Sequence, residues 1–357
     1  MSLDIARRRL LNQRLSGAKF DTPQEVVRWL GAVQSQDYAG AKWALAMRIS
    51  GITDARSIRH LRTARSCAPM SCARPGISSP EDIRWLLKLT APRVHAANAY
   101  YYRQRGLDEA IFGRAHDVLV KTLAGGKQLT RAEIEPALRQ AGIGVEGEQV
   151  FSTILMHAEL EGVVCSGGRR GKQFTYALLD ERAPQARTLE RDEALAELVR
   201  RYFTSHGPAL VKDFVWWSGL TVADATAGLD AAKSQLERAV VDGKTYWLAP
   251  PPHTYTDASP TAYLLPNYDE YTVSYKDRSA FYNPIHDDKA GARENFLFNH
   301  AIIIDGQVVG SWRRKFEKGN AVLDLAPFAP LSAAERTAVD AAMRRFSDFL
   351  GMPVVFA

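Results

Sequence analysis

The chain has 357 residues, of which 46% are hydrophobic and 24% charged, a composition typical of a globular protein with two or three folding units. No apolar run approaches the roughly 18–20 residues that span a bilayer, and the arginine-rich first 14 residues lack the apolar stretch of a secretory signal, so we expect a cytoplasmic protein without a membrane segment. The net charge of +6 agrees with a polyanionic partner without requiring one, and three cysteines are too few for a disulfide framework or a four-ligand zinc site.

Short helices are predicted for the N-terminal part of the chain. Thr22, Pro23 and Glu25 are residue types typical of an N-cap, a first helical position and a first turn, so a helix begins there. Apolar residues continue at helical spacing to Val33. We therefore expect this helix to run into residues 34–37, which read QSQD.

A third amphipathic stretch occupies 41–49, and another helix is predicted after residue 78. Ser79 offers an N-cap for that helix, and Pro80 a first helical position. Residues 64–78 break the pattern around them, because they hold two of the three cysteines and have almost no helical or strand periodicity. An exposed loop is one explanation of this segment.

Two later segments share one pattern. In the first, 107–180, a helix over 108–123 leads to a second helix that is capped by Thr130, with Glu133 completing a capping box. A third helix over about 147–161 precedes two strands joined by a tip rich in glycine and arginine. Three helices followed by a hairpin with a basic tip are typical of a winged helix-turn-helix.

The same order recurs in residues 190–249, where Asp242-Gly243 forms a good hairpin turn. For each segment the alternative is a small α+β domain without a role in DNA binding. The shared order and approximate spacing of the two segments favour winged helices.

Strands dominate after a linker at 250–259, and one long helix at 332–351 precedes a terminal strand. We therefore expect an α+β protein with tandem winged helix-turn-helix domains and a C-terminal β-rich, barrel-like domain. The predicted domains are 1–106, which carries the QSQD motif, 107–187, 188–250 and 251–357.

Familiar catalytic motifs are missing, since the chain has no P-loop, no GxSxG elbow and no HExxH. The eight histidines are dispersed, and we expect His95, His116 and His157 to be capped or half-buried helical residues rather than ligands. Nothing in the sequence requires a metal or an organic cofactor, and we expect none.

The QSQD motif stands out because it places two amides, Gln34 and Gln36, beside the carboxylate of Asp37. Groups that can form hydrogen bonds, stack on bases or bind phosphate follow at once: Tyr38, Lys42, Trp43 and Arg48. If the helix unwinds there, the two amides can project toward one site. The alternative for a turn of this kind is a solvated helix cap.

Residues 33–48 resemble the catalytic motif of the winged-helix DNA glycosylases of the AlkZ-like, or YcaQ-like, group, which carry Gln-x-Gln or Gln-x-Asp after the second helix. Three further stretches, 79–94, 264–278 and 302–314, resemble other signatures of that family, so the similarity covers nearly the whole chain. By this resemblance Gln34 and Gln36 are the two motif glutamines. Asp37 either stabilises positive charge on the sugar or caps the next turn.

The resemblance implies a monofunctional DNA glycosylase that hydrolyses the N-glycosidic bond of N7-alkylated purines, bulky or cross-linked adducts included. An N7-alkylated purine already carries positive charge, so amides that orient water suffice without a strong base. We expect a monomer that acts on double-stranded DNA. A winged-helix transcription regulator and a catalytically silent DNA-binding paralogue are the alternatives.

Contacts to DNA are expected to be mostly to phosphate. The candidates are Tyr38, Lys42, Trp43 and Arg48 near the motif, Arg169, Arg170 and Lys172 in the basic wing, and Arg313, Arg314 and Lys315 at a strand end. A solvated surface charge is the alternative for each cation. The pair Trp216-Trp217 is expected in the core, but only one of two helical neighbours can face fully inward, so the alternative for the other is a place lining a groove. The run 267–278 is interpreted as structural pairing between its own carboxylates and basic groups.

Residues 64–78 depart from the family pattern. Codons for these residues can be chosen so that a shifted frame reads AIVRTHVLRPTWHF, which is similar to a motif of the family. We therefore hypothesise a compensating pair of frame errors around 64 and 78. The nucleotide sequence decides this, and the absence of an insertion or deletion relative to close relatives would contradict it.

Overall fold

The computed structural model describes residues 3–54, 65–70, 74–145, 147–250, 259–283, 285 and 300–356, with the backbone alone for 65–70, 74 and 75. The chain divides into two compact units. Unit 1 comprises Met1–His60, Ala196–Trp217 and Val222–Ala357, and unit 2 comprises Leu61–Leu195 and Ser218–Thr221. Within the described residues, no helix is long and apolar enough to cross a membrane. The finer division into four domains at 106, 187 and 250 stays a prediction.

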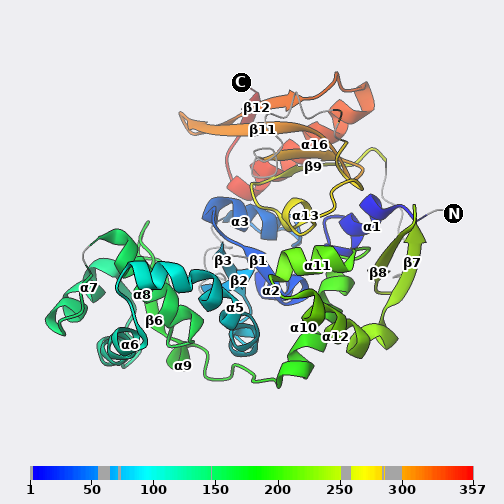
Figure 1. The fold of residues 1–357 in the computed structure, drawn as a ribbon. Helices are drawn as coiled ribbons and strands as arrows, with labels where there is room; N and C mark the ends of the chain where they lie inside the picture. Colours follow the sequence, from blue (N-terminus) through cyan, green and yellow to red (C-terminus); the bar gives the residue numbers. More distant parts are fainter. Residues whose placement is uncertain are drawn as a thin grey trace. The chain divides into compact units, whose positions relative to one another are not determined.

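Unit 2 contains the first three-helix segment in the predicted order. Its elements are α6 (Glu109–Leu123), β4 (Leu129–Thr130), α7 (Arg131–Gln140), α8 (Glu148–Leu160), β5 (Val164–Ser166), β6 (Thr175–Leu178) and the short α9 (Leu179–Arg182) (Figure 1). Strand β6 lies between β4 and β5 and is antiparallel to both. Thr130 and Glu133 form the predicted capping box at the start of α7. One core of buried apolar side chains joins the helices, with Phe112, Leu119 and Ile154 among its members.

Helix α5 (Ile83–Gln104), also in unit 2, begins later than predicted. Its N-cap is Asp82, and Ser79 lies in the turn before it, where the Ser79 carbonyl accepts the Asp82 N–H at 3.0 Å. The buried Asp82 carboxylate also accepts from Trp85 Nε1 at 3.0 Å and pairs with Arg187 at 2.6 Å. The predicted N-cap at Ser79 is therefore wrong. Asp82 takes that position, and its partner Arg187 is 105 residues away, so the sequence around the helix start does not reveal this pair.

An antiparallel hairpin occupies the segment 64–78. Its strands are β2 (Arg65–Met70) and β3 (Arg74–Ser78), and the register pairs Arg65 with Ile77 and Met70 with Arg74, with an irregularity between these pairs. The expectation of a loop is therefore wrong for the backbone of both strands. Residues 64 and 71–73 lie outside the described residues, and the structure does not bear on the hypothesis of frame errors.

The second three-helix segment repeats the order of the first. Its elements are α10 (Arg191–Ser205), α11 (Val211–Ser218), α12 (Val222–Ala232), the 3-10 turn η1 (Lys233–Gln235), β7 (Glu237–Val241) and β8 (Lys244–Leu248) (Figure 1). Asp242 and Gly243 form the predicted hairpin turn with φ of 49° and 73°. An isolated bridge between Ala209 and Trp247 stands where β4 stands in the first segment.

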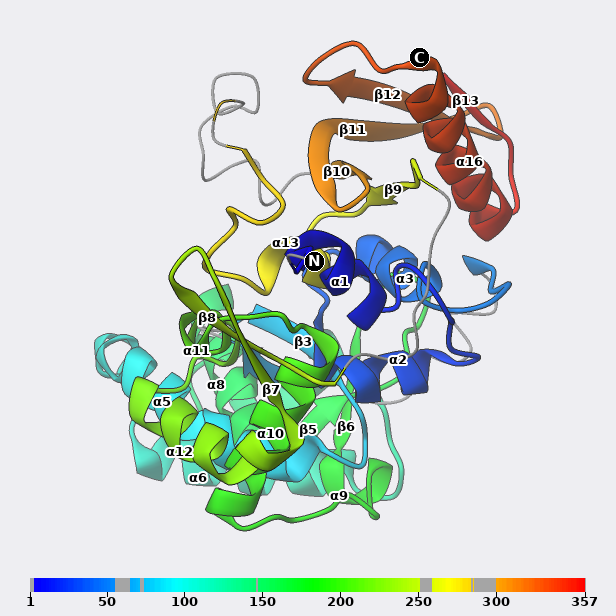
Figure 2. The ribbon, with the colours of Figure 1, turned by 90° about the vertical axis from the view of Figure 1, so that its right-hand side faces the viewer.

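A five-stranded sheet with one long helix, α16, and one short helix, α13, forms the C-terminal part of unit 1 (Figure 2). Its elements are β9 (Ala262–Leu265), α13 (Glu270–Val273), β10 (Ala301–Ile304), β11 (Gln307–Glu317), β12 (Asn320–Pro327), α16 (Ala333–Leu350) and β13 (Val354–Phe356). The strand order is β13-β12-β11-β10-β9, so the described strands leave β9 and β13 at the edges. The barrel-like closure that we predicted is therefore absent from the described strands. Helix α16 packs against the sheet, where Phe346 contacts Trp312.

The N-terminal part of unit 1 comprises α1 (Ile5–Asn12), α2 (Pro23–Leu30), β1 (Ala32–Gln34) and α3 (Tyr38–Ala46). Thr22 is the N-cap and Pro23 the first helical residue, as predicted, and Thr22 and Glu25 also form a capping box. Helix α2 ends at Leu30 because Gly31 has a φ of 83°, a conformation that only glycine adopts without strain. The predicted continuation of this helix into the QSQD motif is therefore wrong.

Replacing Gly31 by alanine should destabilise the protein by about 1–3 kcal/mol, because the new residue adopts a strained φ. A Cβ at Gly31 would also lie 3.4 Å from Trp217 Cη2. Gly113→Ala is the matched control, since Gly113 is exposed within α6 and an added Cβ meets nothing within 4 Å. The control should gain about 0.5–1 kcal/mol in urea unfolding. Equal stability of the two variants would contradict this account of the α2 end.

Candidate active site

The QSQD motif is a turn between β1 and α3. Gln34 ends the strand, and Asp37 is the N-cap of α3, accepting the Ala39 N–H at 3.1 Å. Gln36 is exposed, whereas Gln34 is buried, with only 6% of its surface exposed. Nε2 of Gln34 donates to Oε1 of Gln36 at 3.4 Å, so the two amides meet on one side of the turn.

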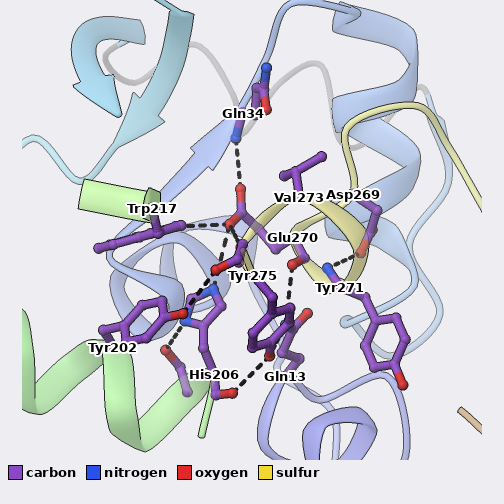
Figure 3. Close-up of polar contacts among 12 residues, drawn as sticks. Gln13, Gln34, Tyr202, His206, Trp217, Asp269, Glu270, Tyr271, Val273 and Tyr275 are labelled. Atoms are coloured by element: carbon purple, nitrogen blue, oxygen red, sulfur yellow. Dashed lines mark hydrogen bonds and ion pairs between the residues drawn. The ribbon is translucent and has the colours of Figure 1, made fainter. Parts of the chain in front are cut away.

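Glu270, the first residue of α13, holds the backbone at the start of the motif (Figure 3). Its Oε1 accepts the Gln34 N–H at 3.0 Å, and its Oε2 accepts from Trp217 Nε1 at 3.1 Å and from Ser274 Oγ at 2.5 Å. Burial raises the pKa of Glu270, but the hydrogen bonds and the nearby His206 outweigh burial, and its pKa lies below the usual value. An ionised carboxylate therefore fixes where Gln34 lies.

Aromatic side chains surround this carboxylate and exclude water from it. The His206 ring stacks on Tyr202 at 4.8 Å between centroids and lies 5.4 Å from the Trp217 ring. Nε2 of His206 is 3.5 Å from Glu270 Oε2. The Tyr275 hydroxyl donates to the His206 carbonyl at 2.7 Å. In Figure 3, His206 and Tyr275 lie on the side of Glu270 opposite Gln34.

Arg48, at the other end of α3, is fully enclosed. Its side chain is 1% exposed and forms a bidentate pair with Asp269, at 2.9 Å from Nη1 and 2.8 Å from Nη2. The remaining N–H groups donate to the Ala44 carbonyl and to the backbone and side-chain oxygens of Gln13. All five donors of the guanidinium are used, so the prediction that Arg48 contacts DNA phosphate is wrong.

Trp43 is also a core residue. It is 3% exposed, donates Nε1–H to the Leu264 carbonyl at 2.7 Å and packs on Phe346 and Phe349. The prediction that it stacks on a base is therefore wrong. Its neighbour Lys42 is buried and pairs with Asp54, with its ammonium 5.5 Å from the Tyr38 ring centroid.

On the outer side of the turn, Asp37 faces Arg314 of β11. The Asp37 Oδ2 lies 3.9 Å from Arg314 Nη2, and the Arg314 side chain is mostly buried. Burial lowers the pKa of Arg314, while the charge of Asp37 opposes this. Burial, together with the charge of Arg314, also lowers the pKa of His300 to about 4, so this imidazole is neutral at pH 7. Nε2 of His300 is buried and has no hydrogen-bond partner within the described part of the chain.

The geometry thus combines an anchored amide, an exposed amide and a carboxylate with a cationic partner. Comparison with known proteins identifies the family of the chain. The family model described as "DNA glycosylase AlkZ-like" matches residues 27–349, which include the motif, α13 and β11. The chain belongs to the AlkZ-like DNA glycosylase family.

A curated protein and a solved structure, both from Streptomyces sahachiroi, are similar to the chain over nearly its whole length. The sequence is 24% identical over 376 residues to an "Interstrand DNA cross-link repair glycosylase", with 97% of this chain and 96% of the relative covered. The fold is similar to the solved structure of "Streptomyces sahachiroi DNA glycosylase AlkZ", with a TM-score of 0.79, 21% identity and 99% and 98% of the two chains covered. Family membership confirms the predicted family and enzyme class, a DNA glycosylase.

The other predicted DNA contacts of this family member lie on two hairpins. On β11, Arg313 and Lys315 are exposed, while Arg314 lies on the opposite face because side chains alternate along a strand. Arg313, Arg314 and Lys315 therefore do not form the single basic cluster that their adjacency in the sequence suggests.

In the β5–β6 hairpin, Arg170 forms a bidentate pair with Glu133 at 2.8 Å, and Arg169 lies over the Phe174 ring at 4.7 Å. Lys172 is exposed. Arg170 must therefore give up a partner within the protein to bind a phosphate there.

The run 267–278 is structural, as predicted, but its partners are distant in sequence. Asp269 pairs with Arg48, and Asp277 pairs with Lys212 at 3.1 Å and Lys244 at 2.9 Å. The sequence analysis missed the support that Glu270 gives the motif, since no local pattern connects residues 236 positions apart. Both tryptophans donate hydrogen bonds to this run: Trp217 to the Glu270 carboxylate at 3.1 Å and Trp216 to the Val273 carbonyl at 3.0 Å.

Arg48→Met should destabilise the protein by about 3–5 kcal/mol, because it leaves the buried Asp269 charge without its partner. Urea unfolding measures this loss. Arg313→Met removes an exposed arginine from β11 and should stay within about 0.5 kcal/mol of the wild type. If Arg48→Met is as stable as the wild type, the interpretation of the Arg48–Asp269 pair as structural is contradicted.

Glu270→Gln should cost about 1–3 kcal/mol at pH 7, because it places an amide donor where three donors now meet an acceptor. The folded-state pKa of Glu270 is lowered from the usual 4.5, so its contribution is complete above pH 4.5 and is lost as the pH falls through the folded-state value. The stability difference between wild type and variant should therefore shrink in acid. A difference independent of pH from 7 down to 3 would contradict an ionised Glu270.

Proposed function

We propose that this AlkZ-like family member hydrolyses the N-glycosidic bond of N7-alkylated purines in double-stranded DNA, with the QSQD turn at the reaction centre. The observation that carries the proposal is the position of Gln34, whose backbone is fixed by the ionised Glu270 while its side chain meets the exposed Gln36. The name of the Streptomyces relative, a cross-link repair glycosylase, supports bulky or cross-linked adducts as the preferred lesions.

In the proposed reaction water attacks C1′ of the sugar while the C1′–N9 bond breaks, and the neutral alkylated base leaves with the bonding electrons. The proton of the water passes to solvent, because an amide is too weak a base to keep it. Gln34 and Gln36 orient the water, and fixed geometry lowers the entropic part of the barrier. Asp37 stabilises the positive charge on the sugar, and Arg314, 3.9 Å away, holds that carboxylate in place.

The two three-helix segments are proposed to be winged helices that bind the DNA backbone, because both show the order helix, helix, helix, hairpin. The phosphate contacts that remain in the proposal are Tyr38, Lys42, Arg169, Arg170, Lys172, Arg313, Arg314 and Lys315. We further propose that the protein acts as a monomer in the cytoplasm.

The test uses a duplex with one N7-methylguanine, incubated with wild type, Gln34→Ala, Gln36→Ala or Gln140→Ala and then cleaved at abasic sites by alkali. Wild type should release the base, and both motif variants should be slower by about 100-fold, as expected for loss of a positioning group. Gln140 is an exposed glutamine at the end of α7, so Gln140→Ala should react as wild type does. A reaction without protein corrects for spontaneous depurination.

Gln36→Ala is the decisive variant, because Gln36 is exposed and its loss should leave stability unchanged. Wild-type rates for Gln36→Ala and Gln34→Ala would overturn the assignment of the motif. No release by the wild type, combined with sequence-selective binding of undamaged DNA, would favour a transcription regulator. No release with unselective binding would favour a catalytically silent paralogue.

A further inference from the structure

Three histidines that are dispersed in the sequence converge in unit 2. His95 lies on α5, His116 on α6 and His157 on α8, and Glu161 is the C-cap of α8. One nitrogen of His95, one nitrogen of His157 and one carboxylate oxygen of Glu161 lie within 4.8 Å of one another. Nitrogen and carboxylate donors gathered at one point are the ligands that zinc prefers.

Nε2 of His95 faces the carboxylate of Glu161 without a hydrogen bond to it. This nitrogen is buried and has no partner in hydrogen-bond geometry within the described residues, although Glu161 Oε1 lies only 2.9 Å away. The other ring nitrogen, Nδ1, is 3.1 Å from the Tyr102 hydroxyl. When Nδ1–H donates to that oxygen, Nε2 carries the lone pair that a metal requires.

Packing holds His157 in a fixed orientation. Its ring stacks on Phe112 at 3.7 Å between centroids with an interplanar angle of 11°, and it is 4.6 Å from the His95 ring. His157 Nδ1 lies 3.2 Å from His116 Nε2. When Nδ1–H donates to that nitrogen, Nε2 of His157 carries the lone pair that a metal requires. His116 thus orients the His157 ring in the same way that Tyr102 orients the His95 ring.

The cluster opens onto a cavity of about 340 Å³ that His95 and Glu161 line, which provides room for a water ligand. Two cations, Arg84 and Lys88, also line the cavity, but Asp180 and Glu190 pair with them. Tetrahedral zinc with ligands at 2.0–2.1 Å places those ligand atoms roughly 3.3 Å apart. The 2.9 Å between His95 Nε2 and Glu161 Oε1 must therefore lengthen slightly, and longer separations within the 4.8 Å cluster must shorten. Glu161 permits this, because its side chain is 48% exposed.

We propose that His95, His157 and Glu161 bind one divalent zinc ion, with water as the fourth ligand. The ion joins α5 to the C-terminal end of α8, the third helix of the segment, and thereby fixes this helix in the unit. The proposal concerns stability and metal content and does not depend on the glycosylase reaction.

The experiment measures zinc bound to tag-free, EDTA-treated protein by equilibrium dialysis against micromolar ZnCl₂ and elemental analysis at pH 7.5, where histidines are mostly uncharged. Wild type should bind one zinc per chain, and its Tm should rise with zinc concentration. His95→Ala and Glu161→Gln should each lower the affinity at least tenfold and lose the Tm response. Cobalt should give the intense visible absorption of a tetrahedral site in the wild type alone.

Glu190→Gln is the matched control. It removes a carboxylate that pairs with Lys88 at the same cavity but lies outside the proposed ligand set, so zinc binding should persist. Circular dichroism without metal checks that each variant folds. No stoichiometric zinc in the wild type, or undiminished zinc in both ligand variants, would overturn the site.

Discussion

Two adjacent buried carboxylates, Asp269 and Glu270, hold the candidate active site together. Asp269 pairs with Arg48 at the end of α3, and Glu270 accepts the backbone N–H of Gln34 just before α3 begins. Removing an ionised group from water costs several kcal/mol unless partners compensate it. Arg48 is the cationic partner of Asp269, and Gln34 gives Glu270 one of its three hydrogen bonds, so a shift of α3 or of the motif turn weakens the compensation of a buried charge.

This constraint suits a reaction centre that is built from amides. An amide neither removes nor supplies a proton at neutral pH, so its contribution depends on where it holds water rather than on a matched pKa. Such a group must be positioned accurately, and loosening by about 1 Å removes much of its effect. The anchor on the Gln34 backbone and the partner that Arg314 gives Asp37 both supply this rigidity from residues distant in sequence.

How much of this could be predicted from the sequence depends on the range of each interaction. The N-cap at Thr22 and the capping box at Thr130 can be predicted because all their partners lie within three residues. Arg48 was misassigned because its partner is 221 residues away, and a basic residue near a polar motif has the same local pattern whether it faces DNA or a buried carboxylate. The barrel-like closure failed for the same reason, because strand patterns predict strands but not which edges pair.

The histidine cluster illustrates the same limit for metal sites. Zinc motifs that can be read from sequence place ligands a few residues apart on one element, whereas His95, His116 and His157 are brought together only by the packing of three helices around Phe112. Burying imidazoles beside one another in an apolar core is unfavourable when any of them becomes charged. A metal ion bound as proposed would remove this conflict, because it would hold the imidazoles neutral and bridge Nε2 of His95 and the Glu161 carboxylate, which lie 2.9 Å apart.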